Sequence, residues 1–440
     1  MKQYDSYKDS GVEWIGEVPR HWKVMKTSLA FHGIGSGTTP STSKKEFYDE
    51  NEGYYWLQTG DLNDGIINNT SKKVTRLAIG QCNLKFYPKD SIVIAMYGAT
   101  IGKVGILGIK TATNQACCVL PANKNMNSKF AFYEFLVCKP ALLVSAIGGG
   151  QPNISQDVIR KQKIVIPPLS EQTIIASYLD KKCSEIDKVI SAQQKRIALL
   201  QELKQSVITH AVTKGLNPNV EMKDSGVEWI GEIPVSWKIV RLKNDCSLKG
   251  RIGWNGLRSE EFEKESYAYL VTGQDFVSSD IDWSKCYQIN KLRYDEDPCI
   301  QLGNGDLLIT KDGTIGKIAK VSNMDKPACL NSGIFVLKQK SRKEFIQGYL
   351  YWSLYSDLLK DFNSFTSTGT TILHLYQNVF ENMPLVVPSK KEQQEISNYL
   401  DEKTMVIDKS ISKAQHQVEL LQEYKQSLIT EVVTGKRKVS

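Results

Sequence analysis

The chain has few histidines, and its cysteines do not form the short pairs that bind metals. The five histidines are dispersed, and none of the nine cysteines lies in a Cys-x-x-Cys pair. No His-Glu-x-x-His or Gly-x-Ser-x-Gly motif is present. The odd number of unevenly spaced cysteines fits reduced thiols better than a disulfide framework. The sequence therefore predicts no metal site and no catalytic residues.

Long apolar runs are also missing. No segment approaches the roughly 18–20 residues that cross a bilayer, and Met1–Asp5 lacks the apolar core of a signal peptide. With 41% apolar and 24% charged residues, the 440-residue chain has the composition of a soluble protein with two to four domains. We therefore expect a cytoplasmic protein without membrane contact. The net charge of +8 slightly favours a polyanionic partner.

Two blocks of the sequence occur twice. The block Lys8–Trp22 returns as Lys223–Trp237, with its first ten residues unchanged. The block Pro167–Gly215 returns from Pro388 to Gly435. The stretches between these blocks have similar lengths and share much less. Repeats of this length indicate duplicated domains, because solenoid units are far shorter.

The second repeated block predicts two long helices. Each begins with an acidic residue, Glu171 or Glu392, which complements the helix dipole, and each ends at a glycine. Apolar residues recur at heptad-like spacing, as in a coiled coil. Gln193, Lys204 and Lys425 interrupt this stripe and could help to determine the register. We expect the two helices to pair with each other in an antiparallel orientation.

The predicted fold class is mixed α/β (α+β). It comprises two copies of a recognition-type domain, separated by two long antiparallel helices that form a coiled coil, with an internal pseudo-twofold repeat. Ser91–Met96 and Asp306–Thr310 read as strands, whereas Phe130–Val137 and Phe345–Trp352 read as helices. The predicted segments are a repeated N-terminal segment (1–24), a domain (25–168), a helix (169–215), a linker with the repeated segment (216–239), a domain (240–388), a helix (389–435) and a basic tail (436–440).

Several prominent residues have simple structural explanations. Trp14 and Trp229 are expected to pack against a domain edge, and the carboxylates Asp180 and Asp187 are expected to be solvated on a long helix. The segment Gly98–Val104 and its counterpart around Gly313 have too few residues between their glycines for a P-loop. They are predicted to be glycine-rich turns between two strands.

Polar residues cluster in loops at equivalent places of the two domains. Such residues suit the reading of DNA bases and the binding of phosphates, although each one alone also fits an ordinary turn. The candidates in the first domain are Ser36, Thr38, Thr39, Gln58, Thr59, Tyr97, Thr100, Lys103, Asn114, Gln115, Gln151 and Asn153. The candidates in the second domain are Lys249, Arg251, Trp254, Thr272, Gln274, Lys311, Thr314, Lys317, Asn331, Ser332, Thr370 and His374.

The chain resembles the specificity subunit of a Type I restriction–modification system. The resemblance lies in the Gly-Val-Glu-Trp-Ile-Gly-Glu-x-Pro-x-x-Trp segments that end at Trp22 and Trp237. It also lies in the Pro-x-x-x-Glu-Gln starts of the long helices, Pro167–Gln172 and Pro388–Gln393. The order of domains and helices matches this family over essentially the whole chain.

The resemblance implies a non-catalytic subunit that binds double-stranded DNA. Each target recognition domain would read one half of a bipartite, asymmetric site, and the helices would set the spacer. The helices would also dock two methyltransferase subunits, which use S-adenosylmethionine to methylate adenine. Restriction subunits that translocate DNA would use ATP and Mg²⁺. These cofactors would be bound by the partner subunits and not by this chain.

Two other classes of protein are also compatible with parts of the sequence. A coiled-coil adaptor with two partner-binding domains would show no salt-dependent affinity for duplex DNA, whereas phosphate contacts release counterions. An autonomous restriction–modification enzyme would methylate DNA by itself, although the chain carries no methyltransferase or nuclease motif.

Overall fold

The chain folds into two compact units. Unit 1 comprises Met1–Gln194 and His416–Ser440, and unit 2 comprises Lys195–Gln415. The computed structural model describes residues 3–49, 51–146, 153–251, 257–340, 344–366 and 375–439. Each unit contains one mixed domain and one half of each long helix, so the units cut across the linear order of the predicted segments.

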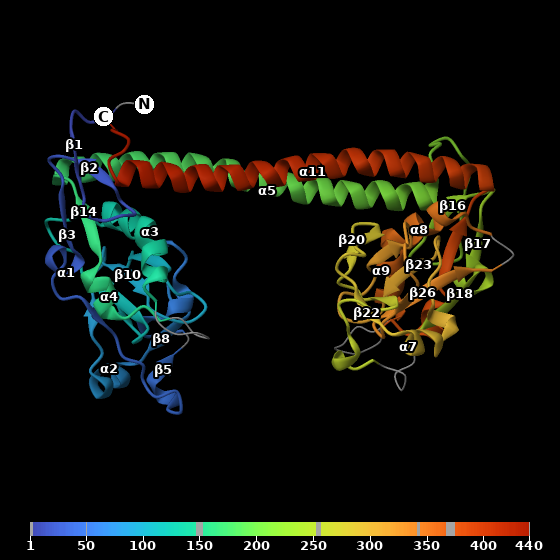
Figure 1. Ribbon diagram of the computed structural model, residues 1–440, viewed down its shortest axis with the longest axis horizontal. Helices are drawn as coiled ribbons and strands as arrows, with labels where there is room; N and C mark the ends of the chain where they lie inside the picture. Colours follow the sequence, from blue (N-terminus) through green and yellow to red (C-terminus); the bar gives the residue numbers. More distant parts are fainter. Residues whose placement is uncertain are drawn as a thin grey trace. The chain divides into compact units, whose positions relative to one another are not determined.

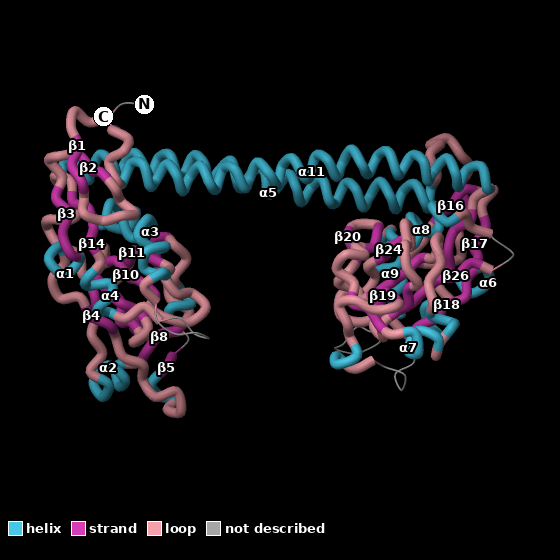
Figure 2. The backbone as a smooth tube through the Cα atoms, viewed as in Figure 1, coloured by secondary structure: helices cyan, strands magenta, loops and turns pink. Residues whose placement is uncertain are grey.

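The two long helices are α5 (Leu169–Lys214) and α11 (Lys390–Val433). At 1.5 Å per residue each is roughly 65–70 Å long. In unit 1, Lys425 Nζ of α11 lies 2.7 Å from Asp187 Oδ1 of α5. In unit 2, Lys204 Nζ of α5 lies 2.7 Å from Asp408 Oδ2 of α11. A late residue of one helix meets an earlier residue of the other in both units, which confirms the antiparallel pairing; Figure 2 shows the two helices side by side.

The apolar stripe of each helix joins the core of its unit. In unit 1, Ile186 and Ile190 belong to one buried cluster with Leu428 and Val432. In unit 2, α5 and α11 contribute to the corresponding buried cluster through residues such as Ala211 and Leu400. The helices are therefore part of each unit's core, because their long apolar stripes need a partner surface.

Two five-stranded sheets form the domain of unit 1. Their strand orders are β4-β13-β10-β11-β7 and β5-β8-β6-β12-β9, and β1-β2 and β3-β14 form separate pairs. The strands are β1 (Tyr7–Asp9), β2 (Glu17–Pro19), β3 (Lys23–Lys26), β4 (Gly35–Ser36), β5 (Tyr48–Asp49), β6 (Tyr54–Leu57), β7 (Gly65–Ile67), β8 (Lys72–Val74), β9 (Phe86–Tyr87), β10 (Ile92–Ala95), β11 (Val104–Leu107), β12 (Thr111–Thr113), β13 (Cys117–Leu120) and β14 (Lys163–Ile166).

Helices cover parts of these sheets. Helix α3 packs on β10 and β11, whose residues are all buried (Figure 1). The helices of this domain are α1 (Thr27–Ala30), α2 (Arg76–Cys82), α3 (Ser128–Val144) and α4 (Gln156–Lys161), with 3-10 turns at Lys45–Phe47 and Thr59–Asp61. Burial on both sides explains why β10 reads as an unbroken apolar run.

Unit 2 repeats this plan with fewer strands. Its main sheets have the orders β18-β26-β23-β24 and β22-β19-β25, and β15-β16, β17-β27 and β20-β21 form pairs. The strands are β15 (Met222–Asp224), β16 (Glu232–Pro234), β17 (Lys238–Arg241), β18 (Cys246–Gly250), β19 (Ala268–Val271), β20 (Phe276–Val277), β21 (Asp280–Ile281), β22 (Tyr287–Ile289), β23 (Leu307–Thr310), β24 (Ile318–Lys320), β25 (Ala328–Leu330), β26 (Ile334–Gln339) and β27 (Pro384–Val387). The helices are α6 (Leu242–Asp245), α7 (Lys291–Asp295), α8 (Gln347–Tyr355), α9 (Asp357–Thr366) and α10 (Gln377–Phe380), with 3-10 turns at Ser259–Glu261 and Pro298–Ile300.

The predicted local elements are confirmed. Strands β10 and β23 and helices α3 and α8 lie where the sequence places them. The glycine-rich segments form turns between β10 and β11 and between β23 and β24. Trp14 and Trp229 are half-buried against the cores of their units, as predicted.

Each long helix ends at a glycine that lies against a buried tryptophan. Gly435 has a φ of 75°, and a Cβ there would lie 3.0 Å from Trp22 Cζ3. Gly215 has a φ of 83°, and a Cβ there would lie 3.1 Å from a ring carbon of Trp237. Glycine suits both positions because it adopts positive φ and has no side chain to clash. The N-terminal segment therefore meets the end of α11 in unit 1 as residues 216–239 meet the end of α5 in unit 2.

Candidate nucleic-acid interface

Loops that follow β4 and β12 meet at one end of the unit 1 domain. Thr38 N donates to Thr113 O at 3.0 Å. Asn114 N donates to the carbonyl of the last residue of β6 at 2.9 Å. The hydroxyl of Thr39 donates to the side chain of Gln115. The fold thus brings four predicted DNA-contacting residues together, although they come from segments that are far apart in the sequence.

Tyr97 and Asn153 extend this group. They pair in an antiparallel bridge, which places the loop after β10 beside the segment before α4. Burial raises the pKa of the Tyr97 phenol, and a hydrogen bond with the Gln115 side chain lowers it. Gln115 therefore connects Thr39 with Tyr97, and the candidate residues form a connected polar cluster.

The other candidates of unit 1 lie on turns next to these loops. Thr59 begins a 3-10 turn, and Gln58 N donates to Asp61 Oδ2 at 2.8 Å. Thr100 and Lys103 lie in the turn between β10 and β11, where Lys103 N donates to Thr100 O at 2.9 Å. Ser36 is half-buried at the end of β4. Backbone hydrogen bonds therefore hold these turns in defined conformations.

The candidates of unit 2 surround an open hollow of about 490 Å³. Its lining includes five predicted DNA-contacting residues, namely Thr272, Gln274, Thr314, Lys317 and Asn331. They come from the loops after β19, β23 and β25. The sequence prediction therefore identified residues that the fold gathers around one concave surface.

Two buried polar side chains hold the turns around the hollow. Asp275 is buried, and its Oδ2 accepts hydrogen bonds from Thr272 N at 2.7 Å and Thr272 Oγ1 at 2.9 Å. Thr310 is also buried; its Oγ1 donates to Thr314 O at 2.5 Å and accepts from Lys317 N at 3.0 Å. Because these bonds exist before any ligand arrives, binding would require little ordering of the turns.

Three further candidates of unit 2 lie near these loops. Lys249 is exposed on β18, and Ser332 is exposed next to Asn331. Lys311 Nζ lies 5.0 Å from the ring centroid of Phe335, within cation–π range.

The prediction for Arg251 is wrong. This residue is 2% exposed, and its Nε donates to Leu330 O at 2.9 Å. Its guanidinium also lies 3.5 Å from Cys329 Sγ. The side chain therefore stabilises the end of β25 inside the domain and is not presented to DNA. Gln151, Trp254, Thr370 and His374 lie outside the described residues.

Sequence reasoning missed two aromatic residues of the hollow. Phe262 and Tyr287 line it, and their ring centroids are 5.2 Å apart. Neither residue lies in a glycine-rich loop, which was the pattern used to select candidates. The sequence signal was a single aromatic residue between polar neighbours in each of two segments, Glu261–Glu263 and Cys286–Gln288.

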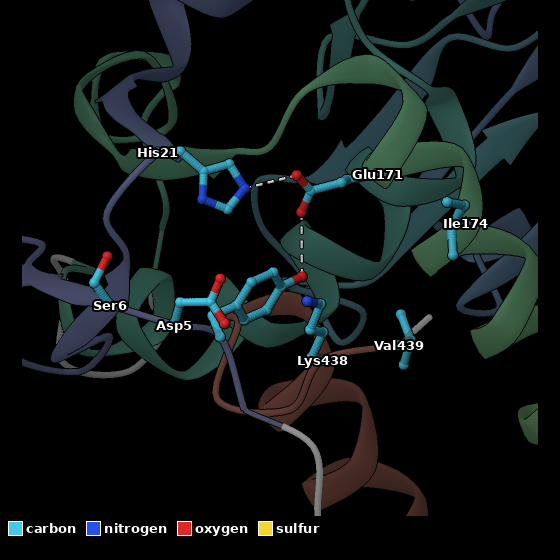
Figure 3. A pocket seen from close by; sticks show the side chains of 8 residues that line it. Asp5, Ser6, His21, Glu171, Ile174, Lys438 and Val439 are labelled. Atoms are coloured by element: carbon cyan, nitrogen blue, oxygen red, sulfur yellow. Dashed lines mark hydrogen bonds and ion pairs between the residues drawn. The ribbon is translucent and has the colours of Figure 1, made fainter.

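The carboxylates at the starts of the long helices do more than complement a dipole. Glu171 accepts hydrogen bonds from Trp22 Nε1 at 3.0 Å and Tyr4 Oη at 3.2 Å, and His21 Nε2 lies 2.6 Å from its Oε1. Figure 3 shows His21 and Glu171 facing each other beside Lys438 of the C-terminal tail, in a pocket of about 360 Å³. Burial, followed by the charge of Glu171, raises the pKa of Tyr4 above its usual range. Glu171 thus fastens the N-terminal segment to α5.

Glu392 has the corresponding role in unit 2. It accepts a hydrogen bond from Trp237 Nε1 at 3.1 Å and from Ser389 Oγ at 2.7 Å. Although burial raises the pKa of Glu392, its hydrogen bonds to Ser389 and Trp237 outweigh this effect and leave the pKa lowered. These contacts give Glu392 a structural role at the start of α11.

Asp180 and Asp187 are partly exposed, as expected, but each also makes specific contacts. Asp180 Oδ1 accepts a hydrogen bond from Tyr133 Oη at 2.9 Å, and its other oxygen pairs with Lys129. Asp187 pairs with Lys425 of the opposing helix. One carboxylate attaches the domain to the long helix, and the other joins the two helices.

The described part of the chain offers no obvious position for a metal ion. Within it, no three His, Cys, Asp or Glu side chains converge in a way that could bind one. Among the same residues, none of the helices combines the length and the apolar character needed to cross a membrane.

Comparisons with known proteins agree with this architecture. The family model described as "Type I restriction modification DNA specificity domain" matches residues 19–198 and 234–420. The MjaVIII specificity subunit of a type I restriction enzyme from Methanocaldococcus jannaschii is 27% identical over 431 residues, which cover 96% of this chain and 94% of that protein. The MjaIX specificity subunit from the same organism is 23% identical over 436 residues, which cover 97% and 95%.

A solved structure supports the fold independently. It is described as "Structural basis underlying complex assembly and conformational transition of the type I R-M system" and matches with a TM-score of 0.71. The match covers 94% of this chain and 98% of the other, at 15% sequence identity, so it speaks for the fold alone. Because the family model matches most of the chain, in two copies, the chain belongs to the family of type I restriction–modification DNA specificity domains.

Proposed function

We propose that this chain is the non-catalytic DNA-recognition subunit of a type I restriction–modification complex. Each unit reads one half of a bipartite, asymmetric DNA site through its loop cluster. The observation that carries this proposal is the gathering of predicted base-contacting and phosphate-contacting residues at one place in each of two duplicated units. The membership of the family supports the same function.

Duplication followed by divergence fits a split DNA site. The two units share their strand plan and their helix contacts but carry different side chains on the loops. Since base recognition depends on the donors and acceptors presented in the groove, different loops read different half-sites. The long helices set the gap between the half-sites.

The proposal assigns the chemistry to partner subunits. Two methyltransferase subunits would dock on the long helices and supply S-adenosylmethionine for adenine methylation. Restriction subunits would use ATP and Mg²⁺ to translocate and cleave DNA. The support for these partners is the family relationship, since such systems combine recognition, modification and restriction chains.

Lysines beside the loop clusters would contribute the sequence-independent part of the affinity. Lys103 in unit 1 and Lys249, Lys311 and Lys317 in unit 2 lie at or near the candidate loops. Each phosphate contact releases counterions, so the affinity for duplex DNA should fall steeply as the salt concentration rises. A protein-binding adaptor would show no such dependence.

The decisive experiment is the mapping of adenine methylation in cells that express this chain with its methyltransferase subunit. We expect two short half-sites around a fixed gap, and the methylation should disappear when the chain is deleted. Exchange of residues 25–165 or 240–385 for those of a relative should then change one half-site at a time. A soluble complex that leaves the DNA unmethylated would contradict the proposal and favour an adaptor.

A further inference from the structure

The hollow of unit 2 contains an exposed aromatic side chain, Tyr287, beside one that packs against the core, Phe262. Tyr287 is 48% exposed, and its ring lies beside that of Phe262 at an interplanar angle of 39°. Both residues line the hollow, which is part of the proposed DNA-binding face. Phe262 packs against the core and lies beside Tyr287, so the exposed tyrosine ring is held at the rim of the hollow, where a ligand can contact it.

A side-chain amide lies in the same hollow. Gln274 is exposed, and among the described residues its side-chain amide makes no hydrogen bond. Its backbone is positioned by the Thr272–Asp275 turn, where Gln274 N donates to Thr272 Oγ1 at 3.3 Å. An amide carries a donor and an acceptor together, and this combination matches N7 and N6 of adenine in the major groove.

Comparison of the two units separates shared roles from specific ones. The turn lysine is common to both, as Lys103 and Lys317. Asn114 and Asn331 are also common, and the backbone N–H of each donates to the carbonyl that ends the neighbouring strand, at 2.9 Å in both units. Residues that are the same in two domains with different targets suit the roles that both targets share, such as phosphate binding and loop support.

The amide and the aromatic residue are different in the two units. Gln274 corresponds to Gly60, since Asn331 N donates to Val271 O as Asn114 N donates to Leu57 O, and Gln274 and Gly60 each lie three residues after that strand end. Asp61 corresponds to Asp275, and each carboxylate holds its turn by accepting a backbone N–H, from Gln58 at 2.8 Å and from Thr272 at 2.7 Å. By the strand registers, Tyr287 pairs with Leu270 as Lys72 pairs with Trp56, so Tyr287 corresponds to Lys72. The hollow therefore has its own chemistry in unit 2.

We propose that the hollow of unit 2 reads one A·T base pair through the major groove. Gln274 binds N6 and N7 of the adenine, Tyr287 contacts the C5-methyl group of the paired thymine, and Lys317 binds a neighbouring phosphate. This inference rests on the proposed function and adds the base pair and the residues that read it. Guanine presents two acceptors there, which an amide cannot satisfy with one donor group in the same bidentate manner.

The test compares methylation motifs of the full complex carrying the wild-type chain, Gln274→Ala or Tyr287→Ser. We expect Gln274→Ala to relax one A·T position in one half-site, with methylation at the wrong base pairs rising roughly tenfold or more relative to the correct one. Tyr287→Ser should relax the same position less strongly. Lys317→Ala should reduce methylation at all sites without relaxing the motif.

Controls and contrary outcomes separate this inference from the proposed function. Lys264→Ala, at an exposed residue outside the hollow, should leave the motif and the extent of methylation unchanged. A split motif that neither Gln274→Ala nor Tyr287→Ser alters would overturn the inference and leave the proposed function intact. Relaxation at a G·C position would also overturn it. Absence of a split motif with the wild-type chain would overturn both proposals.

Discussion

The two units match most closely where they support structure and differ in the loops that we propose contact DNA. Gln172 accepts the N–H of Asn127 at 2.8 Å in unit 1, and Gln393 accepts the N–H of Ile346 at 2.8 Å in unit 2. Their interhelical ion pairs have the same length, 2.7 Å. The candidate loops, by contrast, form a polar cluster in unit 1 and line a hollow with aromatic residues in unit 2. Duplication preserved the contacts that orient the loops, because both half-sites need the same support.

The largest effect should come from lengthening both helices. Insertion of seven residues after Gln194 and after Gln415, where the units divide, preserves the heptad phase and adds about 10 Å to each helix. The gap in the methylated motif should grow by about three base pairs, while both half-sites stay the same. Methylation mapping of the insertion variant measures this. A changed half-site with an unchanged gap would show that the helices do not set the spacer.

Substitution of the repeated tryptophans tests whether the matching contacts of the two units contribute equally to stability. Trp22 and Trp237 are buried, and each donates to the carboxylate that begins a long helix. Trp22→Ala and Trp237→Ala should each lower the free energy of unfolding of their unit by about 3–5 kcal/mol. Urea denaturation followed by fluorescence measures both. A large difference between the two variants in the loss of unfolding free energy would mean that the matching contacts contribute unequally to stability.

The buried carboxyl of Glu134 on α3 has no counterpart at the equivalent position of α8 in unit 2. Burial raises the pKa of Glu134 to about 8, while its hydrogen bond from Val165 N at 2.8 Å lowers it. The residue at the equivalent position of α8 is Ser353, which donates to Tyr349 O. Because the pKa of Glu134 is raised, the native protein keeps this proton to a higher pH than the unfolded chain does. The resulting contribution to the free energy of unfolding is complete below the usual carboxyl pKa and is lost as the pH rises through about 8.

Glu134→Gln should remove this pH dependence. Between pH 5 and pH 9 the wild-type unit 1 should lose a few kcal/mol of unfolding free energy that the variant retains. Ser353→Ala is the matched control in unit 2 and should leave the pH profile unchanged. Thermal denaturation as a function of pH measures all three proteins. Equal pH profiles for the wild type and Glu134→Gln would argue against a neutral buried carboxyl.

The smallest effect should come from the interhelical ion pairs. Lys425→Glu places two like charges together in unit 1 and should cost about 1 kcal/mol, because Asp187 is half-exposed and water screens the pair. Adding Asp187→Lys should restore the stability. The corresponding reversal at Lys204 and Asp408 should behave in the same way. Chemical denaturation at low salt measures these effects, and high salt should reduce them.

The candidate site could be predicted only in part. The loops were found because glycine-rich turns between apolar strands are visible in the sequence, and five of the candidates line one hollow. The burial of Arg251 could not be predicted, since a long basic side chain looks the same in sequence whether it meets a phosphate or a backbone carbonyl. Tyr287 was missed because its exposure depends on what packs around it.

The amino-acid sequence by itself determined the duplication, the long helices and their ends and, in each domain, one buried strand, the glycine-rich turn after it and one helix. These features follow from local rules: heptad spacing, glycine at positive φ and unbroken apolar runs. Only the tertiary structure decided which loops meet, which carboxylates are bonded and which aromatic rings remain open. Those outcomes depend on contacts between residues that lie far apart in the chain, such as Thr39 with Gln115 and Asn331 with Val271.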